Sequence, residues 1–480
     1  MPNYYNEHDP SAAAWLRELI RAREIPDGEV DDRDLREVSA EDLKGYTQVH
    51  LFAGIGGWSY ALKLAGWPED RPIWTGSCPC QPFSSAGNRR GEQDERHLWP
   101  IMFALVEAIR PEFVFGEQVA SPDGRDWMDK VRQHLRGAGY LVAAADLCAA
   151  SVGAPHPRQR LFFGASRVGH ASQFLTPNQA KNPWSEADWL YCQDQSWRPV
   201  EPGSSPLAKD AQARTIRLRG YGNAIVPQVG AAFIDCFLRK DNATQESLTD
   251  ELRRRFPAGS GTLYRTKWSA HRLPGGSICA LRATLLSRIG RKGSTDGAAS
   301  GWASPKASNG NGIGKRGGGA IDLQSMANLA GWATPVATEI GNTLENYLAM
   351  KANMTSGPRS AITHPSLQAQ LVGWPTPDTI NNGVGEAPDA KVRRGMKPGL
   401  NPADAARLTA WVEGEGLNPP RIANGQLQAE AWEDKTGWKL DPGHSRWLMG
   451  FPLSWDACAI TAKPIRRTKK TKRPKKEKGK

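Results

Sequence analysis

The stretch "YTQVHLFAGIGG" at residues 46–57 constrains the fold more than any other part of the sequence. It combines a β-rich run with a glycine-rich turn, and the helical run "WSYALKLAG" follows directly. Glycines at such a turn let backbone amides and a helix N-terminus approach a bound cofactor closely. A glycine-rich turn after a strand can also be purely structural. The pattern therefore predicts the opening of a βαβ unit and leaves open whether a ligand binds there.

Segments of strand and helix character continue to alternate after this turn. Further strands are expected at 72–77, 112–119, 141–147 and 160–166, and helices at 97–110 and 126–139. Such alternation predicts an α/β fold with a doubly wound, Rossmann-like and largely parallel sheet. We assign this domain to residues 47–240.

The two ends of the chain carry opposite charge. Residues 1–46 hold 12 acidic and 6 basic residues, and residues 11–24 predict a helix, so we expect an acidic helical N-terminal extension. Residues 463–480 hold 11 Lys and Arg against one Glu, which predicts a basic disordered tail attracted to polyphosphate. A solubilising tail without a partner is the alternative.

Residues 241–462 are expected to form a loop-rich region. Three segments share a Trp-x-Ser/Thr-Pro core, at 301–312, 331–343 and 373–385. Their tryptophans lie 30 and 42 residues apart, a spacing too irregular for a stacked solenoid. We expect repeated loops, each anchored by its Trp. Residues 252–292 in this region contain ten Lys and Arg and no acidic residue.

Several features argue against whole classes of protein. The sequence has no run of about 18 apolar residues, so no membrane span is expected. The first residues, "MPNYYNEHDP", are polar, so no secretory signal is expected. Seven Cys without a C-x-x-C pair argue against a disulfide framework and a zinc ribbon. We therefore expect a cytoplasmic protein with no metal and no membrane partner.

Three segments carry candidate chemistry. In "PCQPFS", prolines fix the backbone around Cys80 and hold its thiol on a rigid loop, which suits nucleophilic attack as the thiolate. The neighbouring Cys78 is expected to be buried and inert. Glu117 in "GEQV" ends a run of Phe and Val, where a carboxylate is costly to bury unless it has a task. In "HPRQRLFF", Arg158 and Arg160 lie two residues apart, hence on one face of a strand.

Six ordered motifs resemble those of the DNA cytosine-5 methyltransferase family: "FAGIGG", "PCQPFS", "DERHLWP", "GEQV", "APHPRQR" and "GYGNAIVPQV". They extend over residues 47–235 and are specific as a group. The resemblance implies S-adenosylmethionine as the cofactor, double-stranded DNA as the partner, and methyl transfer to carbon 5 of a cytosine that is flipped out of the duplex. We expect the enzyme to be a monomer.

The resemblance also implies roles for single residues. Cys80 is expected to add to carbon 6 of the cytosine, and Glu117 to contact ring nitrogen 3 and the exocyclic amine. Arg160 is expected to hold the base carbonyl, and Arg158 to support the loop or a phosphate. The residues expected to line the cofactor site are Phe52, Ala53, Gly54, Gly56, Leu98 and Asn223.

The sequence departs from the family pattern in the cofactor half. Between Gly57 and Cys80 there is room for one helix and one strand, whereas the family has a further βαβ stretch that carries the acid for the ribose hydroxyls. Glu69 and Asp70 are the nearest substitutes; the alternatives are a residue from elsewhere or weak donor binding. Within the motifs, Gln118 replaces an Asn, and His156 replaces a Gln and is interpreted as an ordinary loop histidine.

A second departure concerns the order of the motifs. About 60 residues separate the paired arginines from the Gly–Asn motif, too few for a large recognition domain. The family's preceding motif is absent there, but "LDPGHSRWLMGFPLSW" stands at 440–455. We expect residues 241–462 to supply DNA recognition, with contacts to phosphates from Arg253, Arg254, Arg255 and Arg265. A separate module that packs against itself is the alternative.

Two other functions stay open. A catalytically impaired relative that binds DNA is favoured by the shortened cofactor half, although Cys80, Glu117 and Arg160 are retained. An RNA cytosine-5 methyltransferase would share the pocket chemistry, but no compact RNA-binding module is evident. By analogy alone, the rearranged order suits a phage or mobile element, and so a bacterial or phage-infected cell.

Overall fold

The computed structural model describes residues 2–79, 98–167, 175–177, 181–192, 196–239, 244–260, 263–285, 298–307, 309, 323–328, 421–423, 426–428 and 438–462. Cys80, the second and third Trp-x-Ser/Thr-Pro segments and the basic tail lie outside these residues.

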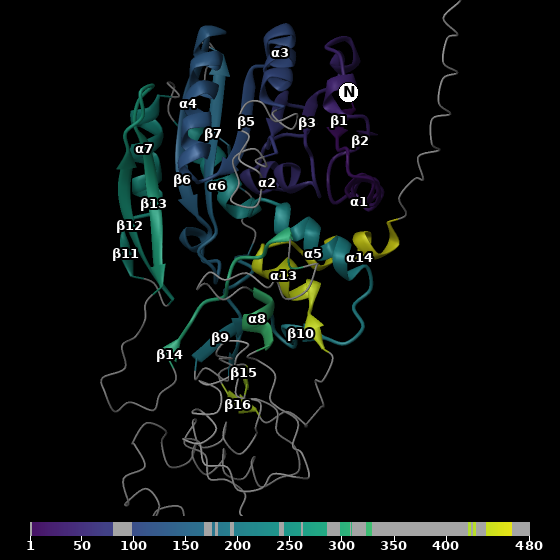
Figure 1. The fold of residues 1–480 in the computed structure, drawn as a ribbon, viewed down its shortest axis with the longest axis vertical. Coiled ribbons are helices and arrows are strands. Elements are labelled where there is room, and N and C mark those ends of the chain that lie inside the picture. Colours follow the sequence, from purple (N-terminus) through teal and green to yellow (C-terminus); the bar gives the residue numbers. More distant parts are fainter. Residues whose placement is uncertain are drawn as a thin grey trace, which may run out of the picture.

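A mixed sheet forms the centre of the described structure (Figure 1). Its ten strands run in the order β11-β12-β13-β6-β7-β5-β4-β3-β1-β2. From β2 to β5 all neighbours are parallel, whereas β7 is antiparallel to both β5 and β6. The strands are β1 (Asn3–Asn6), β2 (Gly28–Asp31), β3 (Gln48–Leu51), β4 (Ile73–Gly76), β5 (Phe113–Val119), β6 (Tyr140–Cys148), β7 (Gln159–Arg167), β11 (Gly259–Ser260), β12 (Tyr264–His271) and β13 (Ile278–Leu285).

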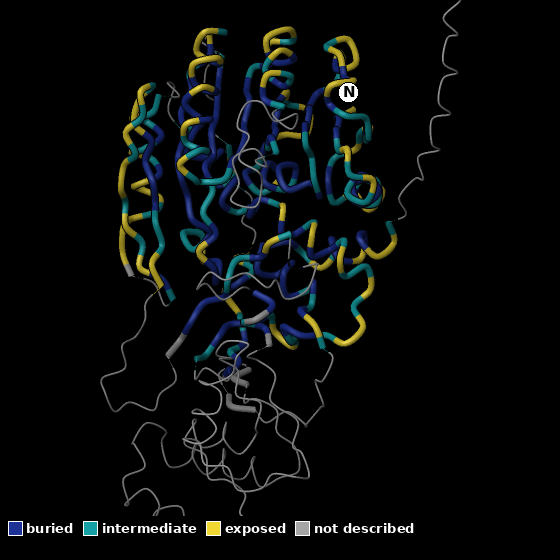
Figure 2. Tube along the Cα trace, viewed as in Figure 1, coloured by how far each residue is buried: buried dark blue, intermediate teal, exposed yellow. Residues whose placement is uncertain are grey.

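Helices cover both faces of this sheet, so the predicted doubly wound α/β fold is confirmed. Because side chains alternate along a strand, Phe115 packs into the core on the side of α2, α6 and α7, and Val114 into the core on the side of α3 and α4. Figure 2 shows the strands buried and the outer faces of the helices exposed. The helices are α2 (Gly57–Ala65), α3 (Trp99–Ile109), α4 (Pro122–Gly137), α6 (Pro227–Leu238) and α7 (Gln245–Arg255).

The N-terminal segment belongs to the sheet, which corrects the expectation of a helical extension at residues 1–46. The expected helix is present as α1 (Pro10–Arg21), with Asp9 as its N-cap. On either side of it, β1 and β2 pair in parallel, and β1 pairs in parallel with β3. The two strands are only four residues long, and β1 has Asn at both ends, so their pattern is weak. The N-terminal segment thus supplies two strands beside β3, although the chain between Gly57 and Cys80 has room for only one strand.

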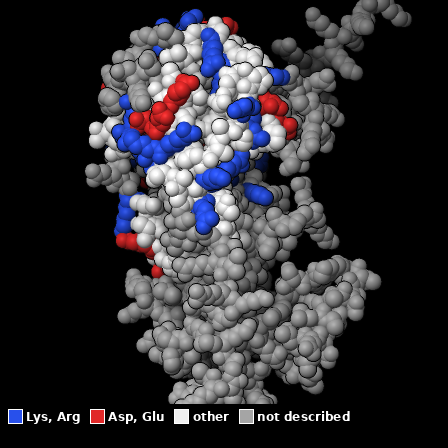
Figure 3. All heavy atoms as spheres, turned by 90° about the vertical axis from the view of Figure 1, so that its left-hand side faces the viewer, with Lys and Arg blue, Asp and Glu red and all other residues white. Residues whose placement is uncertain are grey.

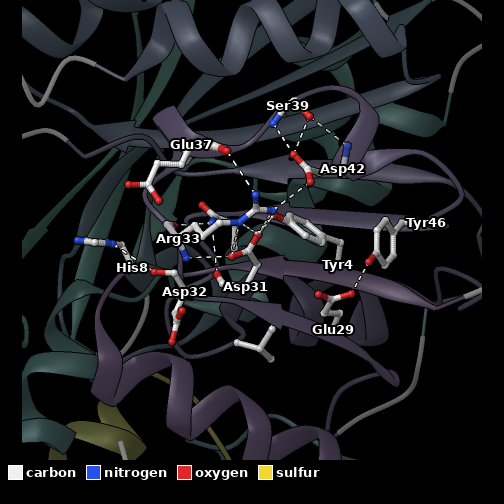
Figure 4. A network of polar contacts seen from close by, with 12 residues as sticks. Tyr4, His8, Glu29, Asp31, Asp32, Arg33, Glu37, Ser39, Asp42 and Tyr46 are labelled. Carbon is white, nitrogen blue, oxygen red and sulfur yellow. Dashed lines mark hydrogen bonds and ion pairs between the residues drawn. The ribbon is translucent and has the colours of Figure 1, made fainter. Parts of the chain in front are cut away.

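A polar network fixes the loop that follows β2 (Figure 4). The Asp31 carboxylate accepts hydrogen bonds from the Arg33 guanidinium, at 2.7 Å from Nη2, and from the Tyr4 hydroxyl at 2.5 Å. Arg33 also pairs with Asp42 at 3.3 Å. Burial opposes the charged form of Asp31, but the hydrogen bonds from Arg33 and Tyr4 hold its pKa below the ordinary value. Asp31 and Asp42 therefore hold the loop after β2 against the edge strands of the sheet.

The sheet also continues past residue 240, where the boundary of the first domain was expected. β13 pairs in parallel with β6, and the hairpin β12–β13 extends the sheet on that side. Residues 259–285 therefore share the sheet of the first domain instead of lying in a separate loop-rich region.

A smaller group of elements lies beyond the end of the sheet at which β1 and β3 terminate (Figure 1). It includes a five-stranded sheet of order β14-β9-β8-β15-β16 and the pair β10-β17. Its strands are β8 (Asp188–Tyr191), β9 (Ser196–Val200), β10 (Leu207–Ala208), β14 (Ala298–Ala299), β15 (Arg421–Ala423), β16 (Gln426–Gln428) and β17 (Lys439–Leu440). Its helices are α5 (Arg214–Asn223), α8 (Leu323–Asn328), α13 (Pro442–Leu448) and α14 (Leu453–Thr461).

The motif at 440–455 packs on the first domain through buried tryptophan. The Trp455 indole donates to the backbone oxygen of Ile55 at 2.8 Å, and the Trp15 indole donates to the backbone oxygen of Trp455 at 3.0 Å. Asp456 accepts hydrogen bonds from Tyr221 at 2.6 Å and from Arg446 at 2.8 Å. Both ends of the described chain therefore meet at the glycine-rich turn. No helix in the described ranges combines the length and the apolar character that a bilayer crossing requires.

This contact predicts a large effect of Trp455→Ala on stability. The side chain is fully buried, and its removal leaves both a cavity and the Ile55 oxygen without its donor. The free energy of unfolding should fall by about 3–5 kcal/mol in urea titrations. Leu453→Ala in the same helix is the control: Leu453 is 68% exposed, so the change should stay within about 0.5 kcal/mol. Equal effects of the two substitutions would contradict the packing role of Trp455.

Candidate active site

The candidate site lies where the parallel strands β1, β3, β4 and β5 end. Ligands of open α/β sheets bind at this carboxyl edge, because the loops after neighbouring strands converge there. In this chain those loops begin with Glu7 after β1, Phe52 after β3, Ser77 after β4 and Ala120 after β5. Glu117 is near the end of β5 itself.

The turn after β3 exposes its backbone beside open space. Phe52, Gly54 and Gly56 have φ angles of 53°, 60° and 76°, and Gly56 is the N-cap of α2. A Cβ added at Gly54 would meet no atom within 4 Å. Phe52, Ala53 and Gly54 are half-buried, so the turn is partly accessible. The left-handed backbone at Gly54 and Gly56 explains why glycine suits these positions.

Glu7 is held against this turn and was not among the residues expected here. Its carboxylate accepts hydrogen bonds at 2.8 Å from the backbone amide of Gly54 and at 2.8 Å from that of Asp9. Burial raises the pKa of Glu7, although the Asp9 and Gly54 amides oppose this effect. A signal was present in the sequence, since Glu7 directly follows the short run "NYYN". An acid therefore stands beside the glycine-rich turn, at the end of the neighbouring parallel strand.

Glu69 and Asp70 were expected to replace the acid that contacts the ribose hydroxyls. They lie at the amino ends of the parallel strands, opposite the carboxyl edge. The Glu69 backbone oxygen accepts a hydrogen bond at 3.2 Å from the side chain of Gln48, the first residue of β3. The loop that carries both acids leads into the start of β4. They are therefore separated from the glycine-rich turn by the length of β3.

The segment that contains the Gly–Asn motif packs against the glycine-rich turn. A Cβ added at Gly57 would lie 3.1 Å from Ile225, and one added at Gly220 would lie 3.1 Å from Ile55. Asn223 lies between Gly220 and Ile225 in the sequence. It is exposed and is the last residue of α5. The remaining residue expected at the cofactor site, Leu98, is half-buried at the N-cap of α3.

Two further residues expected at the site form an ion pair. Glu117 of β5 is buried, and its Oε1 lies 2.7 Å from Nε of Arg160, the second residue of β7. The two side chains come together because β5 and β7 are antiparallel neighbours, with Val119 opposite Arg160. The Arg160 side chain keeps 21% of its surface exposed, so the pair borders solvent on one side. A carboxylate and a guanidinium so placed can donate to and accept from a planar polar ring.

Of the two cysteines in "SCPC", only Cys78 is described. It is buried, its Sγ lies 3.7 Å from the sulfur of Met102, and burial raises the pKa of its thiol far above the ordinary value. Cys78 is thus an inert core residue, as expected. Cys80 lies outside the described residues; Pro79, just before it, follows β4 at the carboxyl edge.

Arg158 has a structural position, in keeping with its expected support of a loop. Its buried guanidinium donates to the backbone oxygens of Pro305 at 2.8 Å, Gly222 at 3.1 Å and Ala224 at 2.7 Å. It therefore joins the arginine motif to the Gly–Asn motif and to the first Trp-x-Ser/Thr-Pro segment. The neighbouring His156 is bonded to the backbone oxygen of Leu448 at 2.8 Å, and burial lowers the pKa of its ring to about 3, so it is neutral near pH 7.

The first Trp-x-Ser/Thr-Pro segment is anchored by its tryptophan. Trp302 is buried, and its indole donates to the backbone oxygen of Pro199 at 2.6 Å. Its backbone amide donates to the oxygen of Pro155 at 2.7 Å, just before the paired arginines. This segment therefore packs against the site instead of forming a module of its own.

Comparison with known proteins agrees with this geometry. Residues 67–195 match the family model of C-5 cytosine-specific DNA methylases. The methylase model thus includes β4 to β8, with Glu117, Arg158 and Arg160.

Several proteins that are similar to this chain are Type II methyltransferases. M.NgoMIV of Neisseria gonorrhoeae is 28% identical over 189 residues, which are 38% of this chain and 51% of the relative. M.AplI of Arthrospira platensis is 33% identical over 177 residues, 29% of this chain and 51% of the relative. M.AquIA of Picosynechococcus is 28% identical over 226 residues, which are 44% of this chain and 82% of the relative. The chain spans about half the length of the first two relatives.

Two solved structures also match at low overall similarity. A DNMT2 mutant from Spodoptera frugiperda has 12% identity and a TM-score of 0.25, over 41% of this chain and 64% of that chain. A DNA modification methyltransferase encoded in an E. coli prophage has 18% identity and a TM-score of 0.23, over 39% of this chain and 55% of that chain.

The hydrogen bonds of Arg158 predict a structural phenotype. Arg158→Ala should lower the free energy of unfolding by about 3 kcal/mol or more, because three backbone oxygens lose a charged donor. Denaturant titration measures the change. Arg36→Ala, which removes a half-exposed guanidinium, should change stability by about 0.5 kcal/mol at most. An unaltered midpoint for Arg158→Ala would exclude the structural role.

Proposed function

We propose that this protein transfers a methyl group from S-adenosylmethionine to carbon 5 of cytosine in DNA. The observation that carries the proposal is the Glu117–Arg160 ion pair at the carboxyl edge, on the sheet whose glycine-rich turn is flanked by Glu7. The family match over residues 67–195 supports the same reaction.

The residues around the glycine-rich turn fit the donor. The backbone at Gly54 borders open space, and the amino end of α2 begins at Gly57. A nucleoside needs an acceptor for its ribose hydroxyls, and in dinucleotide-binding folds an acid at the end of a neighbouring strand supplies it. Glu7 holds this position, and Ile225, two residues after Asn223, contacts the same turn at Gly57. When bound, S-adenosylmethionine supplies an electrophilic methyl group on a sulfonium.

The protein side chains would activate the cytosine, which is a poor nucleophile at carbon 5. The Cys80 thiolate would form a bond to carbon 6, while Glu117 shares a proton with ring nitrogen 3 and Arg160 holds the base carbonyl. The electron pair of the 5,6 double bond then becomes available for methyl transfer. The methyl transfer would break the methyl–sulfonium bond and leave a thioether as the product. Transfer of the carbon 5 proton to a base and cleavage of the bond between the Cys80 sulfur and carbon 6 would then restore the aromatic ring and the thiolate. The target must leave the duplex for these contacts.

The alternative of a catalytically impaired DNA-binding relative rested on the shortened cofactor half. β1 and β2 provide two strands next to β3, and Glu7 provides an acid. This arrangement removes the reason for expecting weak donor binding. The DNA methylase relatives favour DNA over RNA as the substrate.

Glu7→Gln should weaken binding of S-adenosylmethionine by roughly 10- to 100-fold, because a charged acceptor becomes neutral while an oxygen stays for the Gly54 amide. Because the Glu7 carboxylate is protonated as the pH falls through its raised pKa, the parent should bind S-adenosylmethionine less tightly in acid. The affinity of E7Q should not fall over the same pH range. Titration calorimetry measures both. Glu69→Gln, at the opposite edge, should bind like the parent. Parental affinity in E7Q would remove Glu7 from the donor site.

Cys80→Ala should abolish methylation and leave DNA affinity within a few-fold, because the thiolate acts in chemistry. DNA with 5-fluorocytosine at the target should trap a covalent adduct with the parent and none with C80A, as seen by denaturing electrophoresis. Cys78→Ala is the matched control and should form the adduct, since Cys78 is buried in the core. An adduct in C80A would place the nucleophile elsewhere.

A further inference from the structure

We infer that the open face of the β12–β13 hairpin binds the phosphodiester backbone of duplex DNA beside the target base. The inference rests on the proposed function, because it concerns DNA that reaches the Glu117–Arg160 pair. It concerns a part of the sheet that lies outside the matched methylase region.

The hairpin is attached directly to the arginine motif. Gln159, which lies between Arg158 and Arg160, donates from Nε2 to the backbone oxygen of Leu281 at 3.0 Å and to Asp146 Oδ1 at 2.6 Å. At the start of β12, the Tyr264 hydroxyl donates to the Pro155 oxygen at 3.3 Å. β13 is parallel to β6, so the hairpin continues the carboxyl edge that carries Arg160. DNA that enters the site can therefore reach the hairpin along that edge.

The two faces of the hairpin differ in chemistry. On one face, Trp268 packs toward α7, and its indole donates to the Phe256 oxygen at 2.8 Å. Residues alternate along β12, so Arg265 and Lys267 lie on the other face, and both are exposed. Residues 263–285 contain no Asp or Glu. Figure 3, which looks onto this side of the molecule, shows several Lys and Arg side chains on it, with Asp and Glu side chains among them.

The pairing of charges across the hairpin opposes the stability of the strands. Lys267 is directly opposite Arg282 on the neighbouring strand, and like charges at such positions destabilise a sheet. Arg282 is compensated, because its guanidinium lies 2.9 Å from the buried Asp146 carboxylate, with His271 3.6 Å from the same carboxylate. Lys267 adds a further positive charge to this cluster. A polyanion such as the DNA backbone would relieve the repulsion, so charge complementarity identifies the occupant.

The arginines of α7 do not belong to this face, in contrast to the expectation that they would contact phosphates with Arg265. Arg254 forms an ion pair with Glu251, and Arg255 forms one with Asp235 of α6. Both pairs lie on the side of the sheet covered by α6 and α7. The phosphate contact is therefore assigned to the strands and not to the helix.

The test measures binding of a 30-base-pair duplex of mixed sequence to the full chain by fluorescence anisotropy between about 50 and 200 mM KCl. The double variant Arg265→Gln with Lys267→Gln should lower the slope of log K against log salt by about two, and affinity by roughly tenfold or more. The matched control is Arg21→Gln with Lys44→Gln: both side chains are exposed, at 70% and 63%, and lie near the opposite edge of the sheet. The control should keep the slope of the parent.

A single variant separates binding from folding. Lys267→Glu puts an acid opposite Arg282, so its melting temperature should be equal to or above that of the parent, while its DNA affinity falls. Parental DNA affinity in the hairpin variants, or an equal loss in the Arg21 and Lys44 control, would overturn the inference. A parent that binds DNA but never methylates it would instead overturn the proposed function alone.

Discussion

The parallel pairing of β1 with β3 is the interaction on which the candidate site depends. It places Asn6 opposite Leu51, so the next residue of each strand enters the carboxyl edge together. The Glu7 carboxylate then accepts a hydrogen bond from the Gly54 amide, and the Ala53 amide donates one to the backbone oxygen of Asn6 at 2.9 Å. A four-residue strand is stable here because both of its faces are covered: Tyr4 and Tyr5 are buried on opposite sides of the sheet.

The site depends on spatial neighbours and not on the order of segments in the chain. A parallel sheet needs adjacent strands of matching direction, and the connections between them can run by different routes. Here the strand before Glu7 comes from the N-terminus, and the motif that supports the glycine-rich turn comes from residues 440–455. Arg158 joins the arginine, Gly–Asn and Trp302 segments by hydrogen bonds to backbone oxygens. A complete carboxyl edge thus arises from a rearranged sequence.

Sequence patterns predicted the elements with strong periodicity and the residues with unusual chemistry. The glycine-rich turn and the strand that carries Glu117 lie where they were expected, and Glu117 is paired with Arg160. Arg158 and Arg160 do not share one face of a strand as expected, because β7 begins at Gln159 and Arg158 lies before it. The strands β1 and β2 were missed because four residues with polar ends give no alternation that can be recognised. β12 and β13 were missed because the charged residues Arg265, Lys267 and Arg282 interrupt their apolar pattern, although β13 lies inside the sheet between β12 and β6. Glu7 follows the short run "NYYN", but the sequence does not show that this run is a strand beside β3. The position of Glu69 at the other end of β3 likewise depends on which strands are neighbours.

The central claim is that this rearranged chain is a working cytosine-5 methylase. Bisulfite sequencing of DNA from cells that express the protein tests it most directly, because it reports the activity, the modified base and the sequence context together. The account predicts cytosines that resist conversion in a recurring sequence context, and complete conversion when the Cys80→Ala variant is expressed instead. Complete conversion with both proteins, or the same protected cytosines with both, would contradict it.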